Sequence, residues 1–153
     1  MVWDIKKNEL YHAFEKSSHS STCTGVIFSP TNELLLCSAG LDAKIQFFDI
    51  QEKKTVKTIE ANESVSSLSF FTDGITIAAG SPTGKIFIYN LKDFNVKQIL
   101  KGHEGNYIRY IEFIKKTKKT DYNKNRNNKK KEEEKTKSSK FYRYICSITA
   151  FFL

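Results

Sequence analysis

The chain has few of the residues that build metal-binding or redox sites. Its 153 residues include three His and three Cys, and the cysteines Cys23, Cys37 and Cys146 are widely spaced. Without a close cysteine pair or a Cys/His cluster, neither a zinc site nor any other metal site is expected. An odd number of scattered cysteines also argues against a disulfide framework. We therefore expect reduced, mostly buried thiols in a cytosolic or nuclear protein.

A leader sequence and long apolar runs are also lacking. The start, Met1-Val2-Trp3-Asp4, has neither a basic region nor an apolar stretch, so no signal peptide is expected. The apolar run at 144–153 is ten residues long, whereas a membrane span takes about twenty. No membrane partner is expected, and residues 141–153 form either a resumed strand or no folded element.

The surplus of positive charge is confined to one segment. Residues 115–140 hold eleven Lys and one Arg against four acidic residues, whereas the rest of the chain is balanced at 13 of each sign. This segment is too polar to order itself, and we interpret it as a low-complexity insertion. A basic interaction tail is the alternative. Nucleic acid is not the expected partner, because the balanced part has no charge to direct at phosphates.

Against these absences stands an internal repeat of about forty residues. Three apolar segments end in Phe28, Phe70 and Phe113, which are 42 and 43 residues apart. A second element repeats in step and ends in Asp4-Ile5, Asp49-Ile50 and Asn90-Leu91. Repeats of this length form arrays in which each unit packs on the next, and such arrays mostly bind partners.

Within each repeat the apolar residues alternate with a period of two, which indicates strands. Turn residues separate them, as in Ser29-Pro30-Thr31-Asn32 and Thr72-Asp73-Gly74. Each unit reads as four short antiparallel strands, the fourth covering 54–59 and 95–100. Four-stranded sheets repeated at this period predict an all-β fold, the blades of a β-propeller.

The predicted count is incomplete. Residues 1–114 should contain half a blade (2–5 and 9–14), two full blades, and the first strand of another at 107–113. Propellers close with about four to eight blades, so we expect an incomplete propeller of about two to three blades, from a truncated gene product. Open edges and an exposed apolar blade face predict poor solubility.

These repeats resemble the WD40 family. The family signature is Gly-His early in a repeat and Trp-Asp at the end of the third strand. Two dipeptides match this signature, Gly102-His103 and Trp3-Asp4. Its degenerate forms are Phe48-Asp49 and Tyr89-Asn90. The family's turn aspartate is matched by Asp42. His19 is one residue off the usual register, and Glu60-Ala61 replaces Gly-His. The family's buried His–Ser–Asp–Trp hydrogen-bond chain should therefore be complete in no repeat.

Two stretches, 23–59 and 73–87, more closely resemble the centrosomal WD40 adaptors that recruit the γ-tubulin ring complex. The resemblance implies a propeller that directs the protein to spindle and centrosome. It also implies a helical region that binds the γ-tubulin complex beyond the propeller. This chain has no such region, so it should not recruit γ-tubulin alone.

No catalytic residues are predicted. The turn 80–84 lacks the Lys and the spacing of a phosphate-binding loop. His103 has no nucleophile or orienting carboxylate nearby in sequence, and Ser38 is expected to be a hydrogen-bonding core residue. The aromatic residues should be blade core rather than a ligand cage: Phe47, Phe48, Phe70, Phe71, Phe87 and Tyr89. We expect no enzyme, no cofactor and no small-molecule substrate.

The predicted function is a scaffold for protein partners, in γ-tubulin complex recruitment, centrosome and spindle targeting, and microtubule nucleation. Two alternatives stay open. The first is an adaptor subunit of another assembly, such as a ubiquitin ligase or a chromatin or RNA-processing complex. The second is nucleic-acid binding through the basic segment. The predicted location is the cytoplasm, specifically the centrosome or spindle pole, with the nucleus as the alternative.

Overall fold

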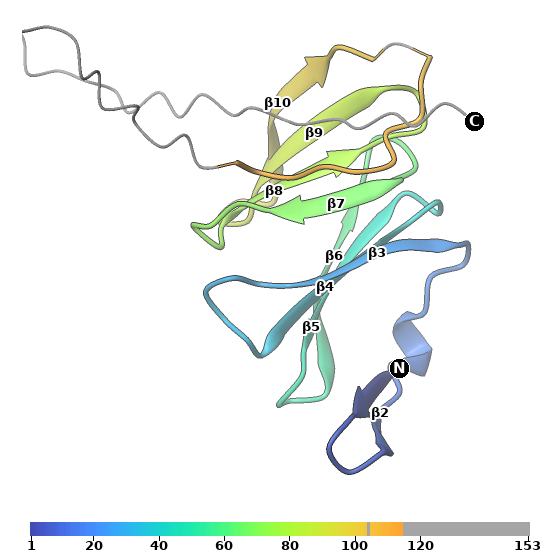
Figure 1. Ribbon diagram of the computed structural model, residues 1–153, viewed down its shortest axis with the longest axis vertical. Coiled ribbons are helices and arrows are strands. Elements are labelled where there is room, and N and C mark those ends of the chain that lie inside the picture. Colours follow the sequence, from blue (N-terminus) through green and yellow to red (C-terminus); the bar gives the residue numbers. More distant parts are fainter. Residues whose placement is uncertain (104, 115–153) are drawn as a thin grey trace, which may run out of the picture.

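The computed structural model describes residues 1–103 and 105–114, which form three antiparallel sheets stacked in chain order (Figure 1). The strands are β1 (Val2–Asp4), β2 (Glu9–His12), β3 (Cys23–Phe28), β4 (Leu35–Gly40), β5 (Lys44–Asp49), β6 (Lys54–Glu60), β7 (Ser67–Phe70), β8 (Thr76–Gly80), β9 (Lys85–Asn90) and β10 (Asn95–Lys101). A 3₁₀ turn at Glu15–Ser17 is the single helical element among the described residues. The all-β prediction is confirmed.

Strands β3–β6 make the first blade and β7–β10 the second, each a meander in which every strand pairs with the next in sequence. The registers repeat: Ala39 faces Ile45 in the first blade, as Gly80 faces Ile86 in the second. With a shift of 41 residues, Ser38 therefore corresponds to Ala79 and Phe48 to Tyr89. The ring is open, as expected.

The core lies between the two blades. One face of the first blade packs on the opposite face of the second, and the buried residues of this inter-blade core are Cys37, Ala39, Ile45, Phe47, Ile59, Val65, Phe70, Ile77, Ala79, Phe87 and Tyr89. Burying a side chain such as Phe47 contributes about 1.5–3 kcal/mol. Alternate residues of each central strand point into this core, which is why their period of two was legible in the sequence.

A hydroxyl group joins each blade to the next. Thr24 Oγ1 lies 3.2 Å from the carbonyl oxygen of Ala39 in its own blade and 2.6 Å from that of Val65, which leads into the second blade. Ser66 repeats the arrangement, at 3.1 Å from Gly80 O and 2.6 Å from Ile108 O. The first strands of the two blades, β3 and β7, also approach closely. A Cβ added to Gly25 would lie 3.3 Å from Leu68 Cβ.

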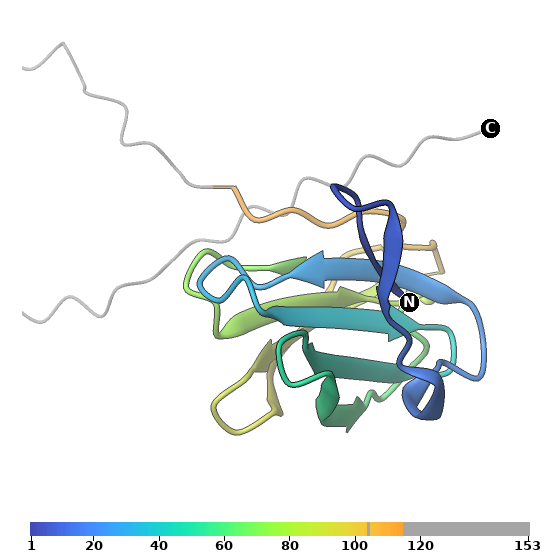
Figure 2. The same ribbon diagram turned by 90° about the horizontal axis from the view of Figure 1, so that it is seen from below.

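The two ends of the array differ from the full blades. Strands β1 and β2 pair as a hairpin, which stands across the strand direction of the first blade (Figure 2). Residues 107–113 do not form the predicted strand, since only Phe113 makes an isolated bridge. A strand needs a hydrogen-bonded neighbour on at least one side, and no described segment supplies one there. The predicted segments 115–140 and 141–153 lie outside the described residues.

Candidate protein-interaction surface

A buried hydrogen-bond chain organises one end of the first blade. His19 Nδ1 lies 2.9 Å from Asp42 Oδ1, and His19 Nε2 lies 2.7 Å from Ser38 Oγ. An ionised carboxylate only accepts hydrogen bonds, so Nδ1 carries the proton toward Asp42, and Nε2 forms the hydrogen bond with the serine hydroxyl. Both ionisable side chains are nearly inaccessible to solvent, at 7% for His19 and 4% for Asp42.

Asp42 is held as a carboxylate by these neighbours. Burial by itself would raise its pKa, but hydrogen bonds from His19 and from the backbone N–H groups of Ser20 and Lys44 outweigh it. The pKa of Asp42 therefore lies below its usual value of 3.8. The carboxylate closes the tight turn between β4 and β5, where Ala43 takes a left-handed φ of 59°.

The connectivity Ser–His–Asp also occurs in hydrolases, but here it lies inside a sheet. Ser38 is paired with Val26 on one side and with Gln46 on the other. Its backbone is thus part of two ladders, whereas an acyl-transfer nucleophile needs exposed N–H donors beside it. The arrangement clamps the loop before β3 to the β4–β5 turn.

This hydrogen-bond chain has three of the four members expected of a strong repeat, namely His19, Ser38 and Asp42. The fourth position is Phe48, which lies on the same face as Ser38 and has no N–H to donate. His19 makes its contacts with Ser38 and Asp42 although it is one residue off register, and the 3₁₀ turn at Glu15–Ser17 lies in the loop that precedes it. Sequence spacing alone missed His19 as a member.

The second blade has an ion pair in place of this hydrogen-bond chain. Ala79 stands where Ser38 would be, and Glu63 instead contacts Thr83 Oγ1 and Lys85 Nζ. The hydrogen bond from Lys85 is the main reason that the pKa of Glu63 lies below its usual value, followed by the bond from Thr83. Because Lys85 is 38% exposed, water screens this pair more than it screens His19 and Asp42.

The turns between third and fourth strands repeat one local motif. Asp4, Asp49 and Asn90 each accept backbone hydrogen bonds within the turn that follows, from Lys6 and Lys7, from Glu52, and from Lys92 respectively. Four residues after each comes a non-glycine residue with positive φ: Asn8 at 55°, Lys53 at 52° and Phe94 at 56°. The terminal acidic or amide position of the repeat therefore shapes a turn.

The other predicted positions are placed as follows. Trp3 is 57% exposed, and its indole makes no hydrogen bond with a described residue. Tyr89 is buried in the inter-blade core, and burial raises its pKa. Gly102 and His103 lie in the bend after β10, where no described side chain bonds to His103. Of the six aromatic residues expected in the blades, five are buried and Phe71 is half-buried.

The expectation of mostly buried thiols is wrong for Cys23. Cys37 is free and buried, and burial raises the pKa of its thiol, but Cys23 is free and exposed. The positions that correspond to Cys23 are Val65 and Ile108, both buried by the preceding blade. Cys23 has no such cover because β1 and β2 do not reach it as a full blade would. Cys146 lies outside the described residues.

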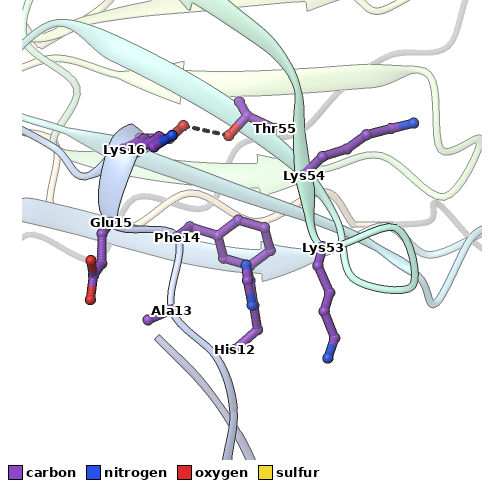
Figure 3. Close-up of a pocket in the computed structure, with 9 residues that line it drawn as sticks. His12, Ala13, Phe14, Glu15, Lys16, Lys53, Lys54 and Thr55 are labelled. Atoms are coloured by element: carbon purple, nitrogen blue, oxygen red, sulfur yellow. Dashed lines mark hydrogen bonds between the residues drawn. The ribbon is translucent and has the colours of Figure 1, made fainter.

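A hollow lies where the segment after β2 meets the β5–β6 turn (Figure 3). It measures about 410 Å³ and is lined by His12, Ala13, Phe14, Glu15, Lys16, Ser17, Lys53, Lys54 and Thr55. Phe14 forms its apolar wall, with a ring centroid 4.7 Å from that of Phe48. Thr55 Oγ1 donates to Ser17 Oγ at 2.6 Å across one end, shown as the dashed line in Figure 3.

Charges of both signs surround this hollow, because Glu15 lines it and Lys54 Nζ lies 3.9 Å from Glu52 Oε2. Lys53 and Lys54 extend outward from its rim in different directions (Figure 3), and Lys53 Nζ also lies 4.6 Å from the centre of the Tyr11 ring. The ammonium groups of Lys53 and Lys54 do not form a phosphate-binding site, because they do not converge on one point.

The described residues hold no cluster of three potential metal ligands. No helix in that part of the chain has the length and hydrophobicity needed to cross a bilayer. Two polar pairs, His19 with Asp42 and Glu63 with Lys85, are engaged in holding turns.

Residues 4–143 match the family described as the N-terminal domain of nucleolar protein 10-like proteins, a β-propeller domain, and this match covers about nine-tenths of the chain. The chain belongs to this β-propeller family. The crystal structure of the RRP9 WD40 repeats superposes on this propeller segment with a TM-score of 0.51 at 18% identity, over 56% of this chain and 28% of that one. The latter likeness shows the WD40 fold alone.

Among curated proteins this propeller segment is 42% identical to Protein NEDD1 of Mus musculus and of Homo sapiens, over 91 residues. These residues are 60% of this chain and 14% of each relative, so the match spans about a seventh of their length. Periodic tryptophan protein 2 of Arabidopsis thaliana is 29% identical over 106 residues, 67% of this chain and 11% of that protein. The resemblance to the WD40 adaptors is confirmed, and the propeller segment is a protein-interaction scaffold.

Proposed function

We propose that this chain is the partner-binding propeller segment of a NEDD1-like scaffold. It acts in γ-tubulin complex recruitment, centrosome and spindle targeting, and microtubule nucleation. The observation that carries the proposal is the 42% identity to NEDD1 over 91 residues. Partners are proteins, the γ-tubulin complex or other centrosomal components, and the chain works in the cytoplasm at the spindle pole.

The described geometry supports binding rather than chemistry. Its buried polar groups hold turns, as His19, Ser38 and Asp42 do. Lys53 and Lys54 extend from the rim of the Figure 3 hollow, with Glu52 beside Lys54. We propose this hollow as one contact site, in which Phe14 receives an apolar side chain and Lys53 and Lys54 attract acidic residues of the partner.

The test uses the full-length gene product with a fluorescent tag. Reversing both rim charges, Lys53→Glu with Lys54→Glu, should reduce the tagged protein at spindle poles and the γ-tubulin complex that purifies with it. The control is Lys101→Glu, a charge reversal at the exposed end of β10 and outside the lining of the hollow. A wild-type protein absent from spindle poles throughout division would refute the function. Normal targeting of the double variant would refute only the contact site.

A second candidate is an adaptor subunit of a nucleolar RNA-processing assembly. It is favoured by the match of residues 4–143 to a family named after a nucleolar protein. The same tagged protein distinguishes the two candidates. Concentration in the nucleolus, with nucleolar proteins rather than γ-tubulin in the purified complex, would support this alternative.

A further inference from the structure

A second hollow lies on the face of the first blade that points away from the second blade. It measures about 290 Å³. The blade supplies the apolar walls Leu36 and Phe48, and the loop after β2 supplies Phe14. Pockets for whole small molecules measure about 300–1,000 Å³, so this hollow suits a single side chain.

Two polar side chains lie next to each other in this apolar lining. Ser38 and Gln46 are direct partners in the β4–β5 ladder, and both line the hollow. Gln46 is 5% exposed, and its amide oxygen Oε1 has no hydrogen-bond partner among the described residues. A buried acceptor without a donor is unfavourable, so a ligand that brings a donor to it gains binding free energy.

The second blade shows that packing against a blade does not call for these polar groups. The pair that corresponds to Ser38 and Gln46 there is Ala79 and Phe87, and both are buried in the inter-blade core. An amide at the position of Phe87 would face apolar side chains and lose its hydrogen bonds to water. The first blade is therefore suited to an occupant that is apolar but carries a hydrogen-bond donor.

We propose that this hollow binds the tryptophan side chain of a partner protein. The indole ring packs against Phe14 and Phe48, and its N–H donates to Gln46 Oε1. Tryptophan fits because it combines a large apolar ring with one donor and no acceptor. A lysine or arginine side chain would bring a charge that these apolar walls do not solvate.

This site is separate from the contact proposed at Lys53 and Lys54, although Phe14 lines both hollows. The inference rests on the proposed scaffold function, because it names the chemistry of a protein partner. Its test uses the purified chain and does not depend on targeting to spindle poles. Either proposal can therefore fail while the other stands.

Two probes that differ at one ring position test the donor. N-acetyltryptophanamide presents the side chain as a peptide does, and its benzothienylalanine analogue has sulfur in place of the indole N–H. Binding to the full 153-residue chain is read as protection of Cys23, an exposed thiol in the lining, from alkylation. Peptide mass spectrometry locates the label.

N-acetyltryptophanamide should protect Cys23 at about tenfold lower concentration than the sulfur analogue, because only the indole satisfies the buried acceptor. No protection by either probe, or equal protection by both, would overturn the proposal. This comparison uses the unaltered chain and requires no variant.

Matched glutamine variants identify the acceptor. Gln46→Leu should abolish the preference for the indole, whereas Gln98→Leu on the exposed strand β10 should retain it. A preference that survives in Gln46→Leu would overturn the assigned contact.

The same experiments distinguish two other occupants. Trp3 is exposed and offers an indole to a second copy of the chain. A mass of twice 17.6 kDa that Trp3→Phe reduces to that of one chain would assign the hollow to a second copy. Protection by free 3-methylindole but not by N-acetyltryptophanamide would assign it to a small molecule. Either result would overturn the proposal of a partner protein.

Discussion

His19 Nε2 and Ser38 Oγ lie 2.7 Å apart, although they come from a loop and from the middle of a strand 19 residues later. The contact, with Asp42 behind it, ties the entry of the first blade to its second turn. The stability of that blade should therefore depend on the state of one carboxylate.

The first prediction concerns acid stability. Because the pKa of Asp42 is lowered in the folded chain, its contribution to the free energy of unfolding is full above the unfolded pKa of about 3.8. That contribution is lost as the pH falls through the lower folded value. Asp42→Asn should cost about 1.5–3 kcal/mol at pH 7 and progressively less as the pH falls below 3.8, measured by urea unfolding. The exposed Glu33→Gln should change neither curve; a constant Asp42→Asn deficit at all pH values would contradict the linkage.

A second prediction completes the hydrogen-bond chain. Phe48→Trp places an indole N–H on the face of Ser38, and a new bond should raise the unfolding free energy by about 0.5–1.5 kcal/mol. The neighbouring Phe47 points into the inter-blade core and is 2% exposed, so Phe47→Trp should instead cost about 1–3 kcal/mol through overpacking. Thermal melts of both variants check this, and identical signs would argue against the assigned faces.

The third prediction tests where the turns of two blades meet. Gly74 has a φ of +69°, and a Cβ there would lie 1.9 Å from Thr31 Oγ1. Gly74→Ala should therefore cost about 1–2 kcal/mol from the backbone conformation alone, with more from the clash. Gly102 has open space around it, so Gly102→Ala should be close to neutral in the same denaturant titration.

The fourth prediction compares equivalent phenylalanines. Phe28 and Phe70 occupy the same position of successive blades, but Phe28 is 52% exposed and Phe70 only 8%, because only Phe70 has a preceding blade beside it. Phe28→Ser should raise solubility and leave the unfolding free energy within about 0.5 kcal/mol. Phe70→Ser should cost about 3–5 kcal/mol. Sedimentation at increasing concentration and chemical unfolding give the two readouts. A large stability loss for Phe28→Ser would mean that this face is covered.

The central strands were predictable because burial on both faces of a blade gives short apolar runs closed by a turn residue. Leu35–Gly40 and Thr76–Gly80 were legible as apolar runs closed by glycine. What the sequence concealed depended on contacts between distant segments. His19 contacts Ser38 and Asp42 from a loop, and segment 107–113 forms no ladder with a described strand.

The turn geometry was hidden for a different reason. Ala43, Lys53 and Phe94 adopt positive φ without being glycine, so nothing in their residue type signals it. Their conformation is set by the carboxylate or amide four residues earlier in the cases of Lys53 and Phe94. Only the repetition of that spacing across the chain could have indicated a shared turn.

The bridging hydroxyls of Thr24 and Ser66 have a mechanical consequence. Separating the first blade from the second would leave the Val65 carbonyl oxygen without the Thr24 hydroxyl, whereas the contact of that hydroxyl with Ala39 O lies within its own blade. Neighbouring blades should therefore resist separation. A force that a bound partner applies to one blade would be shared with the next blade.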